Sequence, residues 1–205
     1  TAINNLTAIN NLTAINNLTV YFTIQYKRSY LNFEKFKTFS LIDKLKLLDD
    51  EFYFLGKGSA RSVYQLSNKL AIKVAINEKG IRQNEIEKTI SKDKNAKNII
   101  AKVILSEKDN KFNIVEYANQ FINEEDFKEK MNIDWDIFSF LITEDKSLQK
   151  INNLNLKQLI LSIRKIINDY NLNKFDVSNL EHWGLTNKNN CVLLDYGLDN
   201  TLFYS

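Results

Sequence analysis

The feature that most constrains the fold is a lysine inside an apolar run. Residues 70–76 read Leu-Ala-Ile-Lys-Val-Ala-Ile, a pattern typical of a strand, with Lys73 at its centre. Burying an ammonium group is costly unless an anionic partner lies beside it. Lys73 therefore indicates either a strand at the edge of a sheet, where the ammonium group reaches water, or a buried strand with a carboxylate nearby.

A glycine-rich segment precedes this strand. Residues 56–61 read Gly-Lys-Gly-Ser-Ala-Arg and follow the aromatic, β-prone residues 51–55. Two strands joined by such a turn let backbone N–H groups approach phosphate oxygens without side-chain obstruction. Alone, the segment predicts only a hairpin with a bulge. Gly56 lies seventeen residues before Lys73, and the two features together are more specific than either alone.

Two acidic residues follow in a segment with helical character. In residues 81–91, Glu85 and Glu87 stand two positions apart, so only one of them can face a sheet. We choose Glu87 as the partner of Lys73, with Glu85 as the alternative, because isoleucines flank Glu87 on the apolar stripe. The acid that does not face the sheet is expected to lie on the solvent-exposed face of the helix. Residues 99–106 and 112–117 predict two further strands, which makes about five strands with one helix after the third.

A carboxylate closes another apolar run near the end of the chain. Residues 191–194 are apolar and lead into Asp195-Tyr196-Gly197, where a carboxylate at a strand end can present a negative ligand to a magnesium–nucleotide. Before it, residues 123–130, 134–143 and 155–170 carry apolar residues at helical spacing. The second half of the chain is therefore predicted to be helical.

Taken in order, these motifs resemble the signature set of the protein kinases. The glycine-rich turn, Ala71-Ile72-Lys73, the acidic helix, Glu116-Tyr117-Ala118 and Asp195-Tyr196-Gly197 carry the likeness, which covers roughly residues 50–205. The arrangement is similar to the very small kinase-like proteins encoded by bacteriophages. The resemblance implies an α+β, minimal kinase-like two-lobed fold, with an antiparallel five-stranded N-lobe containing one helix and a reduced helical C-lobe. Its expected boundaries are 1–19 for a low-complexity repeat, 20–118 for the N-lobe with a preceding strand and helix, and 119–205 for the C-lobe.

The resemblance also implies ATP and Mg²⁺ as cofactors and assigns roles to residues. The residues expected at the nucleotide are Gly56, Gly58, Ser59, Arg61, Lys73, Glu87, Glu116 and Ala118. Lys73 would hold the α- and β-phosphates while paired with Glu87. Asp176, nineteen residues before Asp195, would orient an acceptor hydroxyl.

Asp195 and His182 are the expected metal ligands. His182 stands one residue beyond the position at which kinases carry a metal-binding Asn, and imidazole prefers softer metals than magnesium. Asn179 is therefore the alternative ligand. His182 beside Trp183 is equally well interpreted as a hydrogen-bonded structural residue.

Three departures from the kinase pattern affect the expected activity. Arg61 replaces the third glycine, where it could clamp phosphate or crowd it, and Lys174-Phe175 stands where His-Arg precedes the catalytic Asp. Eight residues follow Gly197, which is too few to form a surface that binds a peptide substrate. We expect ATP binding, with phosphoryl transfer to an unidentified acceptor. The alternative is an inactive pseudokinase, or a viral accessory or structural protein that acts through protein–protein interaction.

Composition bounds the partners and the compartment. The formal net charge is +3, and lysines are interleaved with acids, which argues against a nucleic-acid partner. No run is long and apolar enough to span a membrane, and the single Cys191 fits a reducing compartment. We expect the cytoplasm of a bacterial or virus-infected cell, or a virus particle, with a nucleotide and a host or viral protein as partners.

The start of the chain is repetitive. Residues 1–18 are three copies of Thr-Ala-Ile-Asn-Asn-Leu, whose apolar residues form no continuous face at helical or strand period. We interpret the repeat as low-complexity sequence. Residues 20–30 predict a short strand, and Ser40 predicts the N-cap of a helix over residues 41–50.

Overall fold

The computed structural model describes residues 31–149 and 151–204. The repeat of residues 1–18 and the strand predicted over residues 20–30 lie outside the described residues. No helix among the described residues has the length and apolar character needed to cross a membrane.

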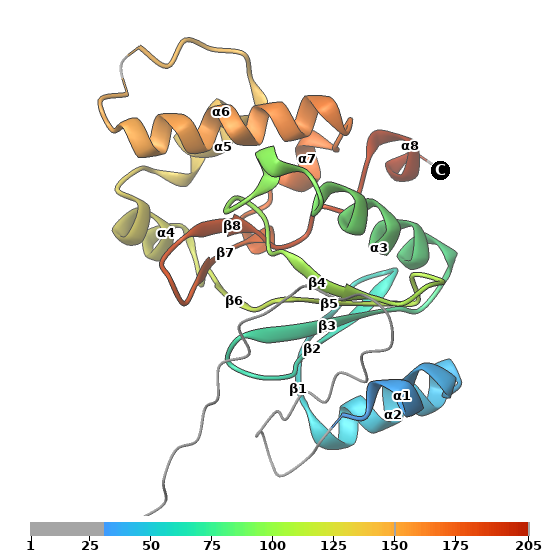
Figure 1. Cartoon of the computed structure of the whole chain (residues 1–205). Helices are drawn as coiled ribbons and strands as arrows, with labels where there is room; N and C mark the ends of the chain where they lie inside the picture. The colour runs from blue at the N-terminus through green and yellow to red at the C-terminus, as the bar shows by residue number, and fades with distance from the viewer. Residues whose placement is uncertain (1–30, 150, 205) are drawn as a thin grey trace, which may run out of the picture.

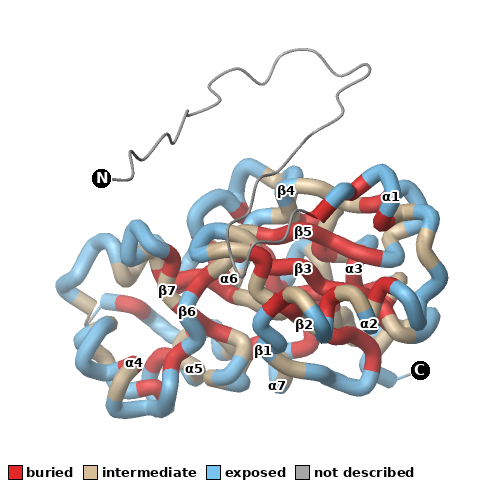
Figure 2. The backbone as a smooth tube through the Cα atoms, turned by 90° about the horizontal axis from the view of Figure 1, so that it is seen from below, coloured by how far each residue is buried: buried red, intermediate tan, exposed pale blue. Residues whose placement is uncertain are grey.

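The predicted five-stranded antiparallel sheet is confirmed. Its spatial order is β1-β2-β3-β5-β4, and every neighbouring pair is antiparallel. The strands are β1 (Tyr53–Lys57), β2 (Arg61–Gln65), β3 (Leu70–Ala75), β4 (Val103–Ser106) and β5 (Phe112–Glu116). Figure 2 shows β3 and β5 mostly in the red of buried residues. Because β3 lies between β2 and β5, Lys73 is not on an edge strand.

Helices cover both faces of this sheet. On one side lie α1 (Phe33–Thr38) and α2 (Leu41–Glu51), and on the other lies α3 (Glu78–Ile90), as Figure 1 shows. The side chain of Ser40 accepts a hydrogen bond from the backbone N–H of Asp43, so the predicted cap of α2 is confirmed. The apolar core between α1, α2 and the sheet is formed by Leu31, Phe33, Phe36, Leu48, Phe52, Tyr64, Leu66, Ile72, Val74, Phe112 and Ile114.

A second, smaller sheet was not predicted. Its strands are β6 (Ala118–Gln120), β7 (Trp183–Thr186) and β8 (Cys191–Leu193), in that order and antiparallel. Around it lie α4 (Glu124–Met131), α5 (Trp135–Thr143), α6 (Leu154–Asp169), α7 (Lys174–Val177), α8 (Asn200–Phe203) and the 3₁₀ turns η1 (Lys94–Ala96) and η2 (Leu180–His182). β8 corresponds to the strand predicted over residues 191–194, whereas β6 and β7 lie in a part of the chain that was predicted to be helical. Strands of three or four residues are too short for a period of two to be recognised.

The larger apolar core joins this second sheet to the end of α3. It contains Ile90 together with Trp183, Phe138 and the inner face of α6. Residues 99–101 pair with β8, since the N–H of Ala101 donates to the carbonyl of Leu193 and the N–H of Leu193 donates to that of Ile99, both at 2.9 Å. The strand expected over 99–106 therefore begins only at Val103, and β8 is fixed beside the segment that leads into it.

Candidate functional site

Four charged side chains from separate elements meet beside α3. Oε1 of Glu87 lies 2.6 Å from Nζ of Lys73 and 3.0 Å from Nη1 of Arg61. Nη2 of Arg61 pairs in turn with Oδ1 of Asp195. Arg61, Lys73 and Glu87 are buried, whereas the Asp195 side chain is 37% exposed. Two cations face two anions, and this balance offsets part of the cost of removing the charges from water.

Strand alternation places Lys73 in this cluster. Successive side chains of a strand point to opposite faces, so Ile72 and Val74 enter the core under α1 and α2 while Lys73 points toward α3. Its ammonium group also donates to the carbonyl oxygen of Leu194 at 2.6 Å. The lysine is thus buried with an anionic partner, which is the second of the two alternatives that the sequence allowed.

The position of Glu87 on α3 distinguishes it from Glu85. Glu87 is fully buried and contacts both cations, whereas Glu85 lies on the exposed face of the helix. The second carboxylate oxygen of Glu87, Oε2, is buried without a hydrogen-bond partner. Both positive charges therefore converge on one oxygen of this carboxylate.

Tyr196 and Gly197 hold Asp195 against α3. The hydroxyl of Tyr196 is buried and donates to the carbonyl oxygen of Ala101 at 2.6 Å. At Gly197 an added Cβ would stand 2.6 Å from the carbonyl oxygen of Gln83 in α3, closer than real Cβ atoms come to an oxygen. Only glycine permits this approach, which brings the preceding Asp195 within reach of residues on α3.

Arg61 turns inward instead of toward the space above the glycine-rich turn. Its Nη1 also donates to Oδ1 of Asn84, 3.3 Å away, so Asn84 and Glu87 hold the guanidinium group from one face of α3. Sequence reasoning missed Asn84, because an amide at helical spacing from a carboxylate carries no signal by itself. Burial lowers the pKa of Arg61, but the carboxylates of Asp195 and Glu87 outweigh it and raise that pKa.

The charge state of Asp195 follows from the same contacts. Burial alone would raise the pKa of Asp195, but the positive charges of Arg61 and Lys73 outweigh burial and hold the pKa well below its ordinary value. Asp195 is therefore ionised at neutral pH, and the positive charge of Arg61 balances it within the protein.

Asp176 and His182 form a second group close to this cluster. Asp176 lies in α7, and His182 Nδ1 is 2.8 Å from its carbonyl oxygen and 3.5 Å from its carboxylate Oδ1. Since a carbonyl only accepts, Nδ1 carries the proton and donates it. Burial first, and the negative charge of Asp195 second, raise the pKa of Asp176 to about 6. Asp176 is thus a carboxylate that can accept a proton near neutral pH.

The glycine-rich turn is open. The five glycines of the chain are all described; at three of them an added Cβ would collide with backbone, whereas at Gly56 and Gly58 it would meet nothing within 4 Å. Neither glycine has a positive φ. Ser59, next in the turn, is exposed, and its carbonyl oxygen accepts from the side-chain amide of Asn77. Packing and backbone conformation therefore give no reason for glycine at positions 56 and 58.

Glu116 and Ala118 lie at the link between the two sheets. Glu116 ends β5 and Ala118 begins β6, with Tyr117 alone between them. Glu116 pairs with Leu70, three residues before Lys73 on β3, which places it about 10 Å along the sheet from the lysine. These two residues are therefore near the charged cluster but not part of it.

The expected metal ligands do not fit a magnesium site as they are arranged. Magnesium demands several oxygen ligands in octahedral geometry. Instead, Asp195 pairs with Arg61, His182 directs Nδ1 to the Asp176 carbonyl, and the side chain of Asn179 caps η2 by accepting from the N–H of Glu181. Within the described ranges, no group of three or more His, Cys, Asp or Glu side chains could hold a metal ion.

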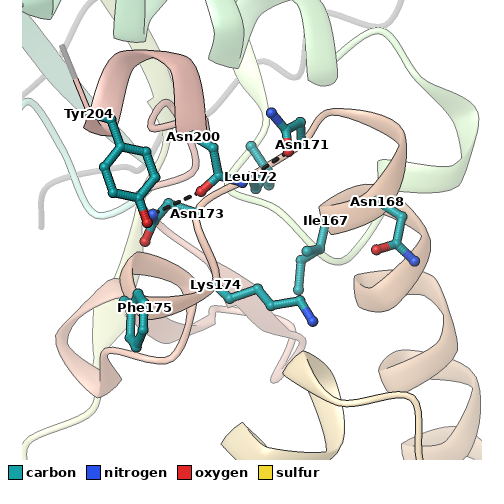
Figure 3. Close-up of a pocket in the computed structure, with 9 residues that line it drawn as sticks. All are labelled: Ile167, Asn168, Asn171, Leu172, Asn173, Lys174, Phe175, Asn200 and Tyr204. Carbon is teal, nitrogen blue, oxygen red and sulfur yellow. Dashed lines mark hydrogen bonds between the residues drawn. The ribbon is translucent and has the colours of Figure 1, made fainter.

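A separate cavity of about 280 Å³ lies where the end of α6 meets α7 and α8 (Figure 3). It is lined by Ile167, Asn168, Asn171, Leu172, Asn173, Lys174, Phe175, Asn200 and Tyr204. Asn200 accepts a hydrogen bond from the amide of Asn173 and donates one to Asn171, so these amides already bind one another. None of the four clustered charges lines this cavity, and no motif in the sequence predicted it.

Comparisons with known proteins find a distant structural likeness and no match in sequence. No protein-family model matches the sequence, and no curated protein matches it. Among solved structures, the chain is similar to a ternary complex of streptomycin, ATP and APH(2")-IIa at 14% identity and a TM-score of 0.42, over 78% of this chain and 72% of that chain.

Proposed function

We propose that the chain is a kinase-like protein that binds ATP between its two sheets, with the phosphates beside Lys73. The observation that carries the proposal is the convergence of Lys73, Glu87 and the Asp195 segment, which lie far apart in the sequence. A buried lysine held by a helix carboxylate and by the backbone before Asp195 is the arrangement that the motif order implies. The likeness to bacteriophage-encoded proteins is part of the same proposal and rests on that order alone.

The glycine-rich turn supports a phosphate ligand. Gly56 and Gly58 are required neither by packing nor by a positive φ, so a ligand that approaches the backbone explains them best. Backbone N–H groups of such a turn can bind phosphate oxygens. The backbone at Glu116 and Ala118 would contact the adenine, since it links the sheet that carries Lys73 to the second sheet, some distance from the lysine.

Thermal denaturation and calorimetric titration with ATP test the proposal. At one hundred times its Kd, a ligand specific to the folded state adds about 2.7 kcal/mol to the unfolding free energy. Wild type should show this stabilisation and Lys73→Met should lose it. The matched control is Lys44→Met, because Lys44 is also a buried lysine but donates to the backbone carbonyls of Lys37 and Phe39 at the end of α1. Equal ATP affinity in wild type and Lys73→Met would contradict the proposal.

Phosphoryl transfer is the second candidate function, and the raised pKa of Asp176, about 6, favours it. A carboxylate with such a pKa can take the proton of an attacking hydroxyl at neutral pH. The test is transfer of label from γ-labelled ATP to the chain itself, to small hydroxyl-bearing acceptors and to lysate proteins. Label transfer should disappear in Asp176→Asn; transfer that persists in this variant would exclude the role of Asp176.

An inactive kinase-like protein that acts on a host or viral protein partner is the alternative. It is favoured by the ion pair between Arg61 and Asp195, which occupies the residue that kinases use for metal. ATP binding without label transfer to any acceptor is the outcome that this alternative predicts.

A further inference from the structure

We infer that Arg61 takes the place of a metal ion at Asp195, so that the chain binds ATP without Mg²⁺. The inference rests on the proposed function, because it specifies the form in which that site takes its nucleotide. It concerns the position at which the sequence departs most clearly from the glycine-rich pattern of kinases.

The protein provides a complete set of acceptors for the guanidinium group. Arg61 is 4% exposed and contacts Asn84 Oδ1, Glu87 Oε1 and Asp195 Oδ1, and the first two residues are fully buried. A side chain that merely crowded the turn would extend into water, since arginine readily keeps its charged end solvated. Arg61 instead links α3 to the segment after β8.

These contacts disfavour a divalent cation at Asp195. A metal ion there would compete for a carboxylate that already binds Arg61, and it would stand beside the positive charge of the guanidinium. If Arg61 moved away, Asn84 would lose the donor to its buried oxygen, and Glu87 would lose one of its two cations. Leaving buried polar groups unpaired is unfavourable, so the arrangement resists exchange of the arginine for a metal.

The same residue adjoins the glycine-rich turn through its backbone. Arg61 directly follows the glycine-rich turn, and its carbonyl oxygen accepts from the N–H of Gly58 at 2.9 Å. The guanidinium group itself is buried against α3 and Asp195, so its contribution to ATP binding would come from its positive charge. Arg61 and Lys73 together would then supply the positive charge that a metal supplies in other nucleotide sites.

The first test compares ATP affinity in EDTA with ATP affinity in excess Mg²⁺, by calorimetry on the whole chain. The inference predicts Kd values within twofold of each other for wild type. Asp195→Asn keeps an oxygen acceptor for Arg61 but removes a negative charge, so ATP in EDTA should bind at least threefold more tightly. The control is Asp49→Asn, which changes a carboxylate that binds the Tyr64 hydroxyl and should leave ATP affinity unaltered.

A second variant tests Arg61 itself. Arg61→Ala frees Asp195, so ATP binding should become at least tenfold tighter with Mg²⁺ than in EDTA. If circular dichroism shows that Arg61→Ala is unfolded, the Asp195→Asn result decides. Titration of wild type with Mn²⁺ alone should show no binding, whereas Mn²⁺ binding that Asp195→Asn abolishes would overturn the inference.

The outcomes separate the inference from the proposed function. Wild type that binds ATP at least tenfold more tightly with Mg²⁺, and loses this gain in Asp195→Asn, overturns the inference and leaves ATP binding in place. Wild type that binds no ATP in either condition overturns the proposed function and the inference with it.

Discussion

Replacement of Asp176 by asparagine should stabilise the protein at neutral pH while removing a group of the proposed site. The Asp176 side chain is only 16% exposed, and burial together with the negative charge of Asp195 raises its pKa from 3.8 to about 6. A raised pKa means that the folded state favours the protonated carboxyl. Asparagine has nearly the same shape and carries no charge at any pH.

The size and direction of the effect follow from linkage between proton binding and folding. The pKa shift is about two units, and each unit corresponds to 1.36 kcal/mol, so the ionised carboxyl costs about 3 kcal/mol of unfolding free energy. Stability contributed by the protonated form is fully present below pH 3.8 and is lost as the pH rises through about 6. Asp176→Asn should therefore exceed wild type by about 3 kcal/mol at pH 7.5 and by almost nothing below pH 4.

Urea unfolding followed by tryptophan fluorescence measures this difference, because Trp135 and Trp183 are both buried. The control is Asp136→Asn, a replacement of an exposed carboxyl that should change stability by less than about 0.5 kcal/mol at either pH. If Asp176→Asn is less stable than wild type at pH 7.5, or if the difference is the same at both pH values, the account of Asp176 is wrong.

Three further predictions test the packing and charges around the site. Gly197→Ala should lower the unfolding free energy by about 1–3 kcal/mol in urea denaturation, because its Cβ would meet the backbone of α3. Gly58→Ala should leave stability unchanged and weaken ATP binding. Equal stability losses in the two variants would refute the reasoning. Glu87→Gln should cost about 3–5 kcal/mol in the same assay, since it leaves two buried cations without their shared carboxylate, and exposed Glu85→Gln should cost under about 0.5 kcal/mol. Burial raises the pKa of Cys191 to about 12, so its thiol should react with a disulfide reagent at pH 8 far more slowly in the folded protein than in urea; similar rates would contradict its buried position.

The sequence predicted those parts of the fold in which a local pattern and a charge requirement agree. Lys73 inside an apolar run left an edge strand or a carboxylate partner, and the apolar stripe beside Glu87 favoured the acid with which Lys73 pairs. The five-stranded sheet and the capped helix α2 followed from patterns long enough to show a period. Local sequence and structure agree at these positions, as expected for a chain that specifies one fold.

The remaining features depend on contacts between distant segments. Asn84 and Asp195 determine that Arg61 points inward and not toward the space above the turn. Asp195 lies 134 residues from Arg61, and no local sequence pattern predicts a contact over that separation. The short strands β6 and β7 exist because they pair with each other and with β8. Pairing between distant segments is set by tertiary structure, which a period in the sequence does not reveal.

The position of a bound nucleotide tests the central claim most directly. A crystal structure of the chain with a non-hydrolysable ATP analogue, grown in EDTA, should place a phosphate oxygen at hydrogen-bond distance, about 2.7–3.2 Å, from Nζ of Lys73. The phosphates should also contact the turn at Gly58. An analogue bound away from Lys73, for example in the cavity at the end of α6, would contradict the account.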